Sequence, residues 1–324
     1  MLQAIEDKVI NGMPINFSEA LELMKVQGSE CVELFSLANR VRSRLGDVID
    51  LCSIVNAKCG LCTEDCRFCA QSMHNDTDVI PHPLMDEEEI LNMALMMQDE
   101  GAARFCIVTS GKDVDGEDFK RILSAIQTIR RETALSVCVS IGLLTGESAG
   151  ALKKAGASRI HHNLETSEAF FRNVCTTHSY SEKIKTVYAA KEAGLEVCCG
   201  GIIGMGESAS DRIELAFTLR KLNVDSIPIN ILNPIKGTSL FNAEPLNPLE
   251  ILKTISVFRL IHPTKNIRIA GGREKNLRDL QSLCLIAGAN GLLLGNYLTT
   301  PGRTPGEDIQ MIKDLGLVPG GVHV

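Results

Sequence analysis

The sequence predicts an α/β fold: a (β/α)8 barrel of the TIM type with an N-terminal helical extension. Short apolar segments alternate with longer amphipathic segments over most of the 324 residues. Such alternation is typical of parallel strands joined by right-handed crossovers. Eight short apolar segments can be counted, which favours a closed eight-stranded barrel. An open six-stranded sheet is the alternative, because the first and seventh segments are short.

The expected strands are short runs rich in aliphatic and β-branched residues. In chain order they span Leu51–Val55, Arg104–Thr109, Leu135–Ile141, Ser158–Asn163, Leu195–Ile203, Ser226–Ile231, Ile267–Ala270 and Gly291–Leu294. The helices expected between them have apolar residues at helical spacing and include Glu87–Glu100, Asp118–Arg131, Tyr180–Ala193, Ala209–Leu222 and Leu249–Ile261. Glycines suited to ending a helix precede several strands, at Gly101, Gly156, Gly194 and Gly288.

The chain is expected to divide into a helical extension (1–45), the barrel (46–300) and a C-terminal tail (301–324). In the extension, Ser18 is expected to cap a helix over Glu19–Val26, and a second helix is expected to begin at Ser29 or Glu30 and to end near Leu45. The tail is rich in Gly and Pro, so we expect it to lie over the surface.

Composition and charge exclude several classes of protein. Hydrophobic residues make up 44% of the chain and charged residues 23%, which is ordinary for a globular protein. A net charge of −7 argues against sequence-independent nucleic-acid binding, which needs a basic face. No apolar run approaches the roughly 20 residues that span a bilayer, and the N-terminus lacks the pattern of a signal peptide. We therefore expect a cytoplasmic protein that engages neither nucleic acid nor membrane.

Twelve cysteines in such a protein predict metal ligation or catalysis rather than disulfide bonds. Four of them lie in the segment CGLCTEDCRFC, Cys59 to Cys69, directly after the first expected strand. Barrel enzymes place their chemistry in loops at this end of a strand. The spacing C-x3-C-x2-C at Cys62, Cys66 and Cys69 can hold a [4Fe-4S] cluster whose fourth iron stays open. An open iron can bind the amino and carboxylate groups of S-adenosylmethionine (SAM), so the motif predicts a radical SAM enzyme.

Alternatives remain for these cysteines. With Cys59 the spacing becomes C-x2-C-x3-C-x2-C, which is compatible with a closed four-thiolate zinc or ferredoxin-like site. All four loop cysteines could instead be structural, although the loop is polar and contains glycine. Elsewhere, Cys31, Cys52 and Cys284 are interpreted as small buried hydrophobic residues.

Over most of its length the chain resembles the biotin synthase family, whose members insert sulfur into dethiobiotin. The resemblance runs from about residue 49 to about residue 300 and includes CGLCTEDCRFCAQS, RFC, VCVSIG, HHNLETS, VCCGGIIGMGE, IPIN and IRIAGGRE. It implies a second, auxiliary [2Fe-2S] cluster deep in the barrel, held by Cys106, Cys138, Cys198 and Arg268. These residues lie on separate expected strands, and inward side chains of a parallel barrel share one interior volume.

The resemblance also implies roles for further residues. Asn163 and Glu165 match residues beside the SAM ribose, Glu165 standing in place of the more familiar aspartate. Phe68 and Ile202 match contacts of the adenine. Asn230 matches an asparagine in the pocket shared by SAM and dethiobiotin. Asn163 and Asn230, together with the three loop cysteines, are therefore the candidate catalytic residues.

The implied reaction converts dethiobiotin to biotin. Two 5′-deoxyadenosyl radicals, formed from two SAM molecules, remove hydrogens from carbons that no base can deprotonate, and the auxiliary cluster donates the sulfur. The implied partners are dethiobiotin, a flavodoxin- or ferredoxin-type reductant and a second copy of the chain in a homodimer. The alternatives are another radical SAM reaction, such as that of a mutase or a hydrogenase-maturation enzyme, and, outside enzymes, an electron-carrying or zinc-stabilised binding module.

The chain departs from the family pattern at three places. His161-His162-Asn163 replaces NHN, Cys175 precedes TTHSY in place of an apolar residue, and Cys199 replaces a serine beside Cys198. These departures motivate a variant hypothesis, in which Cys175 joins the three barrel cysteines to hold a four-iron auxiliary cluster. Arg268 would then be a hydrogen-bond donor rather than a ligand. The alternative is that Cys175 is a plain surface or core thiol.

Overall fold

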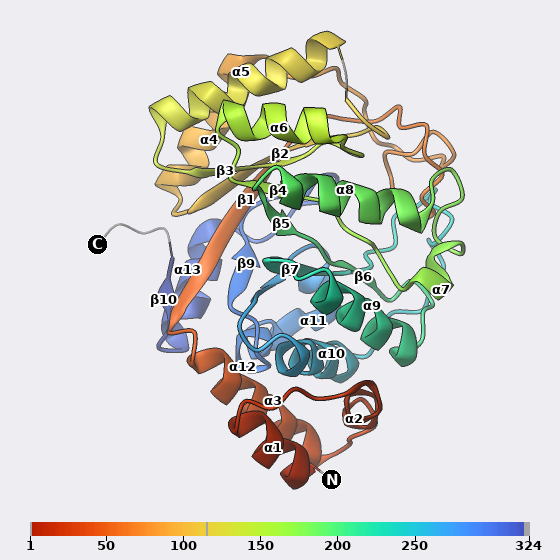
Figure 1. Ribbon diagram of the computed structural model, residues 1–324, viewed down its shortest axis with the longest axis vertical. Coiled ribbons are helices and arrows are strands. Elements are labelled where there is room, and N and C mark those ends of the chain that lie inside the picture. The colour runs from red at the N-terminus through yellow and green to blue at the C-terminus, as the bar shows by residue number, and fades with distance from the viewer. Residues whose placement is uncertain (1, 115, 321–324) are drawn as a thin grey trace.

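The structure is a computed structural model that describes residues 2–114 and 116–320. Its central feature is a closed barrel of parallel strands, surrounded by helices in Figure 1. Neighbouring strands pair in the order β1-β2-β3-β4-β5-β7-β8-β9, and β9 pairs back with β1. The closure confirms the eightfold barrel and excludes the open sheet. The strands are β1 (Val48–Lys58), β2 (Arg104–Thr109), β3 (Ser136–Ser140), β4 (Arg159–His161), β5 (Glu196–Cys198), β6 (Gly201–Ile203), β7 (Ser226–Ile231), β8 (Asn266–Ile269) and β9 (Gly291–Leu293).

The expected strand over Leu195–Ile203 is interrupted and forms two short strands, β5 and β6. Both pair with β7, β5 through Cys198 and Ser226 and β6 through three residue pairs. Between them the backbone passes close to β7: a Cβ atom on Gly200 would lie 1.9 Å from the carbonyl oxygen of Pro228. Only glycine fits so close to another backbone, so the break is built into the sequence at this position.

Side chains alternate between the two faces of each barrel strand. On β2, Phe105 and Ile107 belong to the large core between strands and helices. Cys106 and Val108, which alternate with Phe105 and Ile107 along the strand, pack in a separate cluster inside the barrel. This twofold period directs every second residue of a strand into the interior. It is what allows cysteines far apart in the sequence to face one another.

The helices cover the outside of the barrel. The five expected helices are present, with ends that differ by a few residues, and α6 follows β3. The longer ones are α4 (Glu87–Asp99), α5 (Gly116–Glu132), α6 (Gly146–Ala155), α8 (Tyr180–Glu192), α9 (Ala209–Lys221) and α10 (Pro248–Ile261). Short helices that the sequence did not predict are α7 (Glu168–Phe171), α11 (Arg273–Leu277), the 3-10 helix η1 (Arg278–Leu280) and α12 (Leu283–Ile286).

The N-terminal residues form three helices at one end of the molecule, at the bottom of Figure 1. They are α1 (Leu2–Ile10), α2 (Phe17–Leu23) and α3 (Ser29–Ser43), and α3 packs against α10. The expected cap Ser18 is wrong, because it lies inside α2. Asn16 caps this helix instead: its side chain accepts from the Glu19 backbone N–H at 2.9 Å, and Glu19 accepts from the Asn16 N–H.

The residues after Pro301 do not simply lie over the surface. They form α13 (Pro305–Asp314), which buries Met311 and Ile312, and a short strand β10 (Val318–Pro319) that pairs with β1. Within the described residues, Arg273 of α11 and Asp308 of α13 form an ion pair with no solvent exposure of either side chain. The C-terminal helix is thus fastened to the barrel by a buried charge pair.

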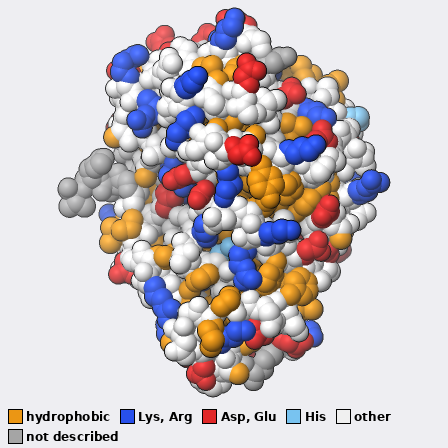
Figure 2. Space-filling model, in the orientation of Figure 1, with side chains coloured by type: hydrophobic (Ala, Val, Ile, Leu, Met, Phe, Trp, Pro, Cys, Tyr) orange, Lys and Arg blue, Asp and Glu red, His pale blue; other side chains and the backbone are white. Residues whose placement is uncertain are grey.

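The face of the molecule shown in Figure 2 carries basic and acidic side chains interspersed, with hydrophobic side chains in small groups between them. That distribution lacks the single-sign field of a nucleic-acid-binding face. Among the residues that the structure describes, no helix combines the length and the apolar character needed to cross a bilayer.

Candidate active site

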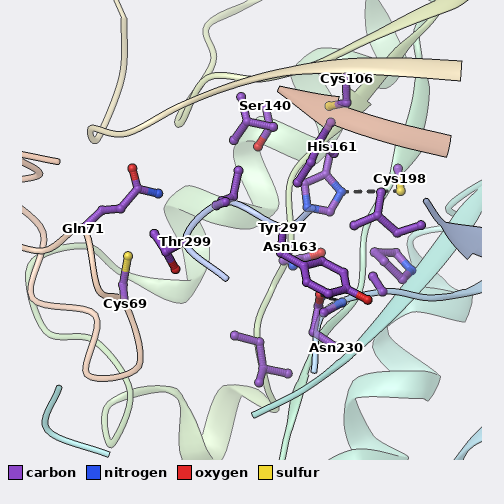
Figure 3. Close-up of a pocket in the computed structure, with 18 of the residues that line it drawn as sticks. Cys69, Gln71, Cys106, Ser140, His161, Asn163, Cys198, Asn230, Tyr297 and Thr299 are labelled. Atoms are coloured by element: carbon purple, nitrogen blue, oxygen red, sulfur yellow. Dashed lines mark hydrogen bonds between the residues drawn. The ribbon is translucent and has the colours of Figure 1, made fainter. Parts of the chain in front are cut away.

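Twelve of the predicted site residues line one cavity of about 400 Å³ within and above the barrel. They come from the loop after β1 and from the inward positions and carboxyl ends of the strands. They are Cys62, Cys66, Phe68, Cys69, Cys106, Cys138, Asn163, Glu165, Cys198, Ile202, Asn230 and Arg268. The structure therefore brings them together, while the role of each stays a prediction. Figure 3 shows Cys69 on one side of the cavity, with Cys106 and Cys198 on another.

The loop after β1, which we call the cluster loop (residues 59–77), is folded by its own hydrogen bonds. The Cys62 backbone N–H donates to Gln71, and the Met73 N–H donates back to Cys62. The Asn75 side-chain amide donates to the carbonyl oxygens of Cys66 and Cys69, at 3.2 and 2.9 Å. These bonds hold the loop in one shape at the mouth of the barrel, so three of its thiols can face a single bound group.

Cys59 lies outside this cavity. Its backbone forms an antiparallel bridge with His82, and its side chain is buried. Burial raises the pKa of the Cys59 thiol. The closed four-thiolate site that would include Cys59 therefore disagrees with the geometry, whereas the three-cysteine set fits it.

Two thiols of the cluster loop, those of Cys66 and Cys69, are poor acids without a metal. A hydrogen bond from Cys66 to Cys175, and then burial, raise the pKa of Cys66. Burial raises the pKa of Cys69 to about 11. Iron binding must therefore displace protons from these groups, as is usual for buried thiolate ligands.

Three further thiols lie deeper in the barrel. Cys106 and Cys138 are directly paired across β2 and β3, and Cys198 lies on β5 beside His161 of β4. All three side chains are only 3% exposed and line the same cavity, because each occupies an inward-facing position of its strand. A hydrogen bond with Cys138, together with burial, raises the pKa of Cys106. Such a set of soft donors in a closed volume suits an iron–sulfur cluster better than a hard cation.

Arg268 and His161 complete the inner region. Arg268 is buried and forms an ion pair with Asp50 of β1. Its Nε–H has no hydrogen-bond partner among the described residues. The His161 Nδ1 lies 3.5 Å from the Cys198 sulfur. A buried donor without a partner is costly, and an anionic sulfide-bearing group in this cavity would satisfy it. The residues present therefore fit an auxiliary cluster.

Asn163 and Asn230 fasten the strand ends that border the cavity. The Asn163 carbonyl oxygen Oδ1 accepts from the Gly200 N–H at 3.1 Å. The Asn230 side chain accepts from the Gly271 N–H at 3.0 Å and donates to the Gly201 carbonyl at 3.3 Å. Each asparagine thus has a structural task in addition to the predicted contact with SAM.

The segment GGIIGMGE (residues 200–207) is held in place by hydrogen bonds to a buried carboxylate. The buried Glu207 carboxylate accepts from the backbone N–H groups of Gly204 and Met205, at 2.8 and 2.7 Å. Arg212 of α9 donates to the same carboxylate at 2.8 Å. A Cβ atom on Gly201 would lie 2.3 Å from the Glu165 carbonyl oxygen, so its glycine is needed for close approach.

The expectation that Cys175 joins the barrel cysteines is wrong. Cys175 follows α7 and does not line the barrel cavity. Its sulfur, the Cys66 sulfur and a ring nitrogen of His178 all lie within 4.8 Å of one another. Its sulfur contacts the Asp65 carboxylate at 3.1 Å. The sequence could not show this, because the contact depends on how a loop 110 residues away folds back.

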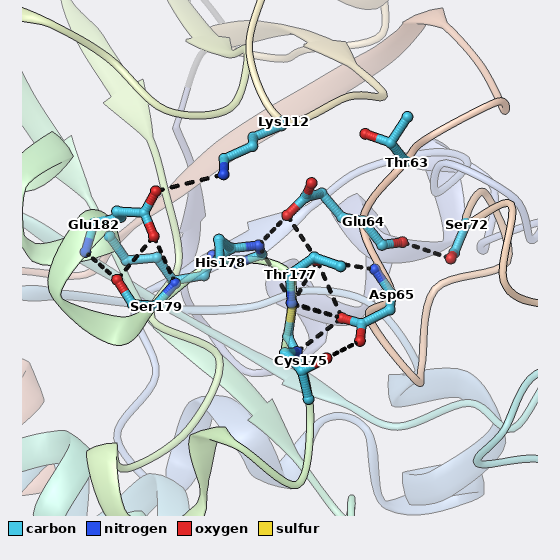
Figure 4. A network of polar contacts seen from close by, with 12 residues as sticks. Thr63, Glu64, Asp65, Ser72, Lys112, Cys175, Thr177, His178, Ser179 and Glu182 are labelled. Atoms are coloured by element: carbon cyan, nitrogen blue, oxygen red, sulfur yellow. Dashed lines mark hydrogen bonds and ion pairs between the residues drawn. The ribbon is translucent and has the colours of Figure 1, made fainter.

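The segment 175–178 clamps the cluster loop, as Figure 4 shows. The Asp65 carboxylate accepts from the backbone N–H groups of Thr176 and Thr177, and Glu64 pairs with His178. Burial alone would raise the pKa of Asp65, but the hydrogen bonds from this segment hold it well below its usual range. Hydrogen bonds from Cys66, His178 and Thr177 lower the pKa of Cys175 to about 4, although burial opposes them.

Cys52, Ser140 and Tyr297 also line the cavity and were not predicted from the sequence. Cys52 was interpreted as a core residue because its run, LCSIV, is apolar. A usable signal was present: Cys52, Ile54 and Asn56 alternate along β1, and Ile54 pairs with Cys106 of β2. Which of the alternating residues of β1 face the barrel interior became known only from the pairing of β1 with β2.

Comparisons with known proteins agree with this geometry. The radical SAM superfamily matches residues 59–219, and the biotin and thiamin synthesis associated domain matches residues 228–318. The chain is 52% identical to the biotin synthase of Carboxydothermus hydrogenoformans, covering 97% of this chain and 98% of the relative. It is 53% identical to that of Geotalea daltonii, covering 98% and 97%. This chain belongs to the biotin synthase family. Biotin synthases from other bacteria, such as Geobacter sulfurreducens, match at 52% identity over a similar length.

Solved structures show that the barrel is shared more widely than the biotin synthase family. Methylornithine synthase superposes with a TM-score of 0.86 at 22% identity, covering 98% of this chain and 97% of that one. The FeFe-hydrogenase maturase HydG from Carboxydothermus hydrogenoformans gives 0.84 at 18% identity, covering 98% and 79%. At such identities the likeness concerns the fold alone, so the family assignment rests on the biotin synthase relatives.

Proposed function

We propose that this protein converts dethiobiotin to biotin by radical SAM sulfur insertion. The observation that carries the proposal is one cavity lined by two sets of thiols, the cluster-loop set and the barrel set. A reaction that joins a radical source to a sulfur source needs both within one enclosed volume. Membership of the biotin synthase family, with about half of the residues identical, supports dethiobiotin as the substrate.

When bound, a [4Fe-4S] cluster would supply the electron that cleaves SAM, and an auxiliary iron–sulfur cluster would supply the sulfur atom. The chain's own residues would hold and orient these groups. Cys62, Cys66 and Cys69 would be the ligands at the mouth of the barrel. Cys106, Cys138 and Cys198 would be ligands of the inner group, which is of the [2Fe-2S] type or a four-iron variant.

The remaining lining residues would bind the organic molecules. Asn163 and Glu165 present an amide and a carboxylate to the cavity and are suited to the hydroxyl groups of the SAM ribose. Phe68 and Ile202 provide an apolar surface for the adenine. Asn230, already held by two backbone groups, would orient SAM and dethiobiotin relative to one another.

The protein's contribution to catalysis would be positioning and the exclusion of water. A carbon-centred radical needs no acid or base, but it must be kept from other hydrogen donors. Ile54, Val108 and Leu298 line the cavity with groups of low polarity. Such walls exclude water, and the positions of the bound molecules must then direct the radical to the substrate rather than to the protein.

We further propose a flavodoxin- or ferredoxin-type reductant, a homodimeric assembly and a cytoplasmic location. The reductant is required because the cleavage of SAM consumes an electron that the substrate does not provide. The dimer rests on the family resemblance and is testable by light scattering. The location rests on the sequence pattern described above and is testable by cell fractionation. No nucleic acid or membrane is part of the proposal.

Anaerobic reconstitution with iron and sulfide, followed by SAM, reductant and dethiobiotin, tests the function. We expect biotin and about two 5′-deoxyadenosines per biotin by mass spectrometry. Cys106→Ala should still form deoxyadenosine but no biotin, Cys66→Ala should form neither, and Cys284→Ala, a buried cysteine outside the cavity, should form both. Deoxyadenosine without biotin in the unaltered protein would refute the substrate, and neither product from a protein with intact clusters would refute the reaction class.

A further inference from the structure

The segment that clamps the cluster loop brings three metal-binding side chains to one point. The sulfurs of Cys66 and Cys175 and a ring nitrogen of His178 all lie within 4.8 Å of one another. The Cys175 sulfur lies 3.3 Å from the Nδ1 atom of His178. Donor atoms around one tetrahedral zinc ion are about 3.3–3.8 Å apart, because Zn–S bonds are about 2.3 Å and Zn–N bonds about 2.0 Å long. The three donors are therefore close enough to share a single ion.

A carboxylate is available to complete this set of donors. Glu64 forms an ion pair with His178 at the same Nδ1 atom, and it accepts a hydrogen bond from the Thr177 hydroxyl at 2.9 Å. The side chains of Glu64 and His178 are each only 8% exposed. In Figure 4, Glu64 approaches His178 from the cluster loop. Two thiolates, an imidazole and a carboxylate suit Zn²⁺, whereas Ca²⁺ and Mg²⁺ need oxygen ligands.

The donor set lies between two cavities, one of which reaches the surface. An outer cavity of about 480 Å³ is lined by Cys175 and His178 and by the exposed residues Arg172 and Thr176. Cys66 lines the barrel cavity instead. An ion therefore has a path from the surface to Cys175 and His178 that does not pass through the barrel, and Cys66 meets it from the inner side.

Cys66 is also one of the three predicted ligands of the [4Fe-4S] cluster. A thiolate that binds a single ion together with Cys175 and His178 is not free to bind a cluster iron with Cys62 and Cys69. The two metal sites therefore exclude one another, and a site for a single ion belongs to the protein before its cluster is assembled.

We propose that the cluster-free protein binds one Zn²⁺ through Cys66, Cys175 and His178, with Glu64 as the fourth ligand, and that this ion withholds Cys66 from the [4Fe-4S] cluster until it is displaced. Binding releases the protons of the two thiols to solvent, and that of the ring nitrogen where His178 is charged, and it transfers no electron. The site goes beyond the proposed function, because it concerns the chain without its clusters.

The test uses the full-length Cys62→Ala/Cys69→Ala chain, which we call the pair variant, prepared anaerobically without iron. It lacks two ligands of the [4Fe-4S] cluster but keeps the proposed zinc ligands. Cobalt(II) is the probe, because it absorbs visible light in tetrahedral thiolate sites. The barrel thiols can also bind cobalt, so the reading is the difference between the pair variant and the same chain with one further substitution.

Cys175→Ser keeps a hydroxyl that can donate to Asp65 but removes the soft ligand. Added to the pair variant, it should lower the bound cobalt by about one ion per chain and weaken zinc binding at this site by more than about 100-fold, since loss of a group that only supports a ligand already costs about 10–100-fold. His178→Ala should have the same effect. Cys284→Ala, at a buried cysteine outside both cavities, should change neither quantity.

The second reading uses the unaltered chain loaded with one equivalent of Zn²⁺. Assembly of the [4Fe-4S] cluster, followed by its visible absorption, should be at least about 10-fold slower than without zinc, because the ion must first leave Cys66. Cys175→Ser should remove that delay.

Two outcomes would overturn the inference. Equal cobalt counts in the pair variant and its Cys175→Ser form, with circular dichroism showing both folded, would exclude the site. An assembly rate that does not respond to zinc would exclude the withholding of Cys66. Biotin formation is measured on cluster-loaded protein, so either failure would leave the proposed function intact.

Discussion

Asp65 provides the sharpest test of how the cluster loop is held. Its carboxylate accepts hydrogen bonds from the Thr176 and Thr177 backbone N–H groups at 2.8 and 3.2 Å, and from the Thr177 hydroxyl at 3.1 Å. The Thr176 hydroxyl also donates to it. The perturbation is Asp65→Asn, which preserves the size of the side chain but removes its charge and replaces one acceptor oxygen with an NH2 group.

The magnitude follows from the kind of hydrogen bond that is lost. A hydrogen bond to a charged acceptor contributes about 1.5–3 kcal/mol, and one between neutral groups about 0.5–1.5 kcal/mol. The two backbone bonds survive in Asp65→Asn as neutral ones, so each should weaken by about 1 kcal/mol. The free energy that docks the loop on residues 175–178 should fall by about 2 kcal/mol, which shifts the equilibrium toward the released loop about 30-fold.

The assay is the anaerobic rate of iron loss from the reconstituted protein to a ferrous chelator at neutral pH. If release of the loop precedes iron loss, Asp65→Asn should lose the cluster-loop iron up to about 30-fold faster, while the auxiliary iron is lost at the original rate. Asp78→Asn, at an exposed carboxylate of the neighbouring segment, is the matched control. Equal rates for the two variants would refute the claim that the clamp stabilises the cluster loop.

Three other substitutions test separate parts of the molecule. Gly201→Ala would place a Cβ atom 2.3 Å from the Glu165 carbonyl and shift β6, so turnover should fall about 100-fold, whereas Gly150→Ala, with no atom within 4 Å of its Cβ, should not change it. Asp308→Ala removes the fully buried partner of Arg273 and leaves only the partly exposed Glu274 carboxylate, at 3.5 Å, so urea denaturation should show a loss of about 3 kcal/mol in the free energy of unfolding. Burial lowers the pKa of His262 to about 3. Because the unfolded chain then binds the extra proton, stability should fall by about 1 kcal/mol per pH unit below pH of about 6.5. His262→Gln should remove that contribution in urea denaturation compared at successive pH values, and an unchanged slope would refute it.

The cluster loop could be predicted from the sequence because its ligands are local. Cys62, Cys66 and Cys69 fall within one short segment, so any fold that leaves the loop open lets their thiols converge. The inward set of Cys106, Cys138 and Cys198 was implied by the family resemblance, and the expected barrel agrees with it, because the period of two along each strand can direct such residues into one volume.

Some local signals competed with one another, and only the folded chain decided between them. Asn16 and Ser18 are both good helix caps, and the backbone conformation before Phe17 selects Asn16. In the C-terminal region, Thr304 and Glu307 form a capping box, with proline at the first helical position, that starts α13. The surrounding glycines and prolines outweighed that signal in the sequence-based prediction.

The sequence by itself predicted the barrel and the radical SAM loop from periodicity and spacing, and it predicted the inner cysteine set through its resemblance to the biotin synthase family. Only the tertiary structure decided where Cys52 and Cys175 belong. Cys52 lies in an apolar run much like that of Cys284, and its direction depends on the closure of β1 against β9. Cys175 meets Asp65 through a contact across 110 residues. Neither relation leaves a local pattern, since both arise from the pairing of segments that are distant in the chain.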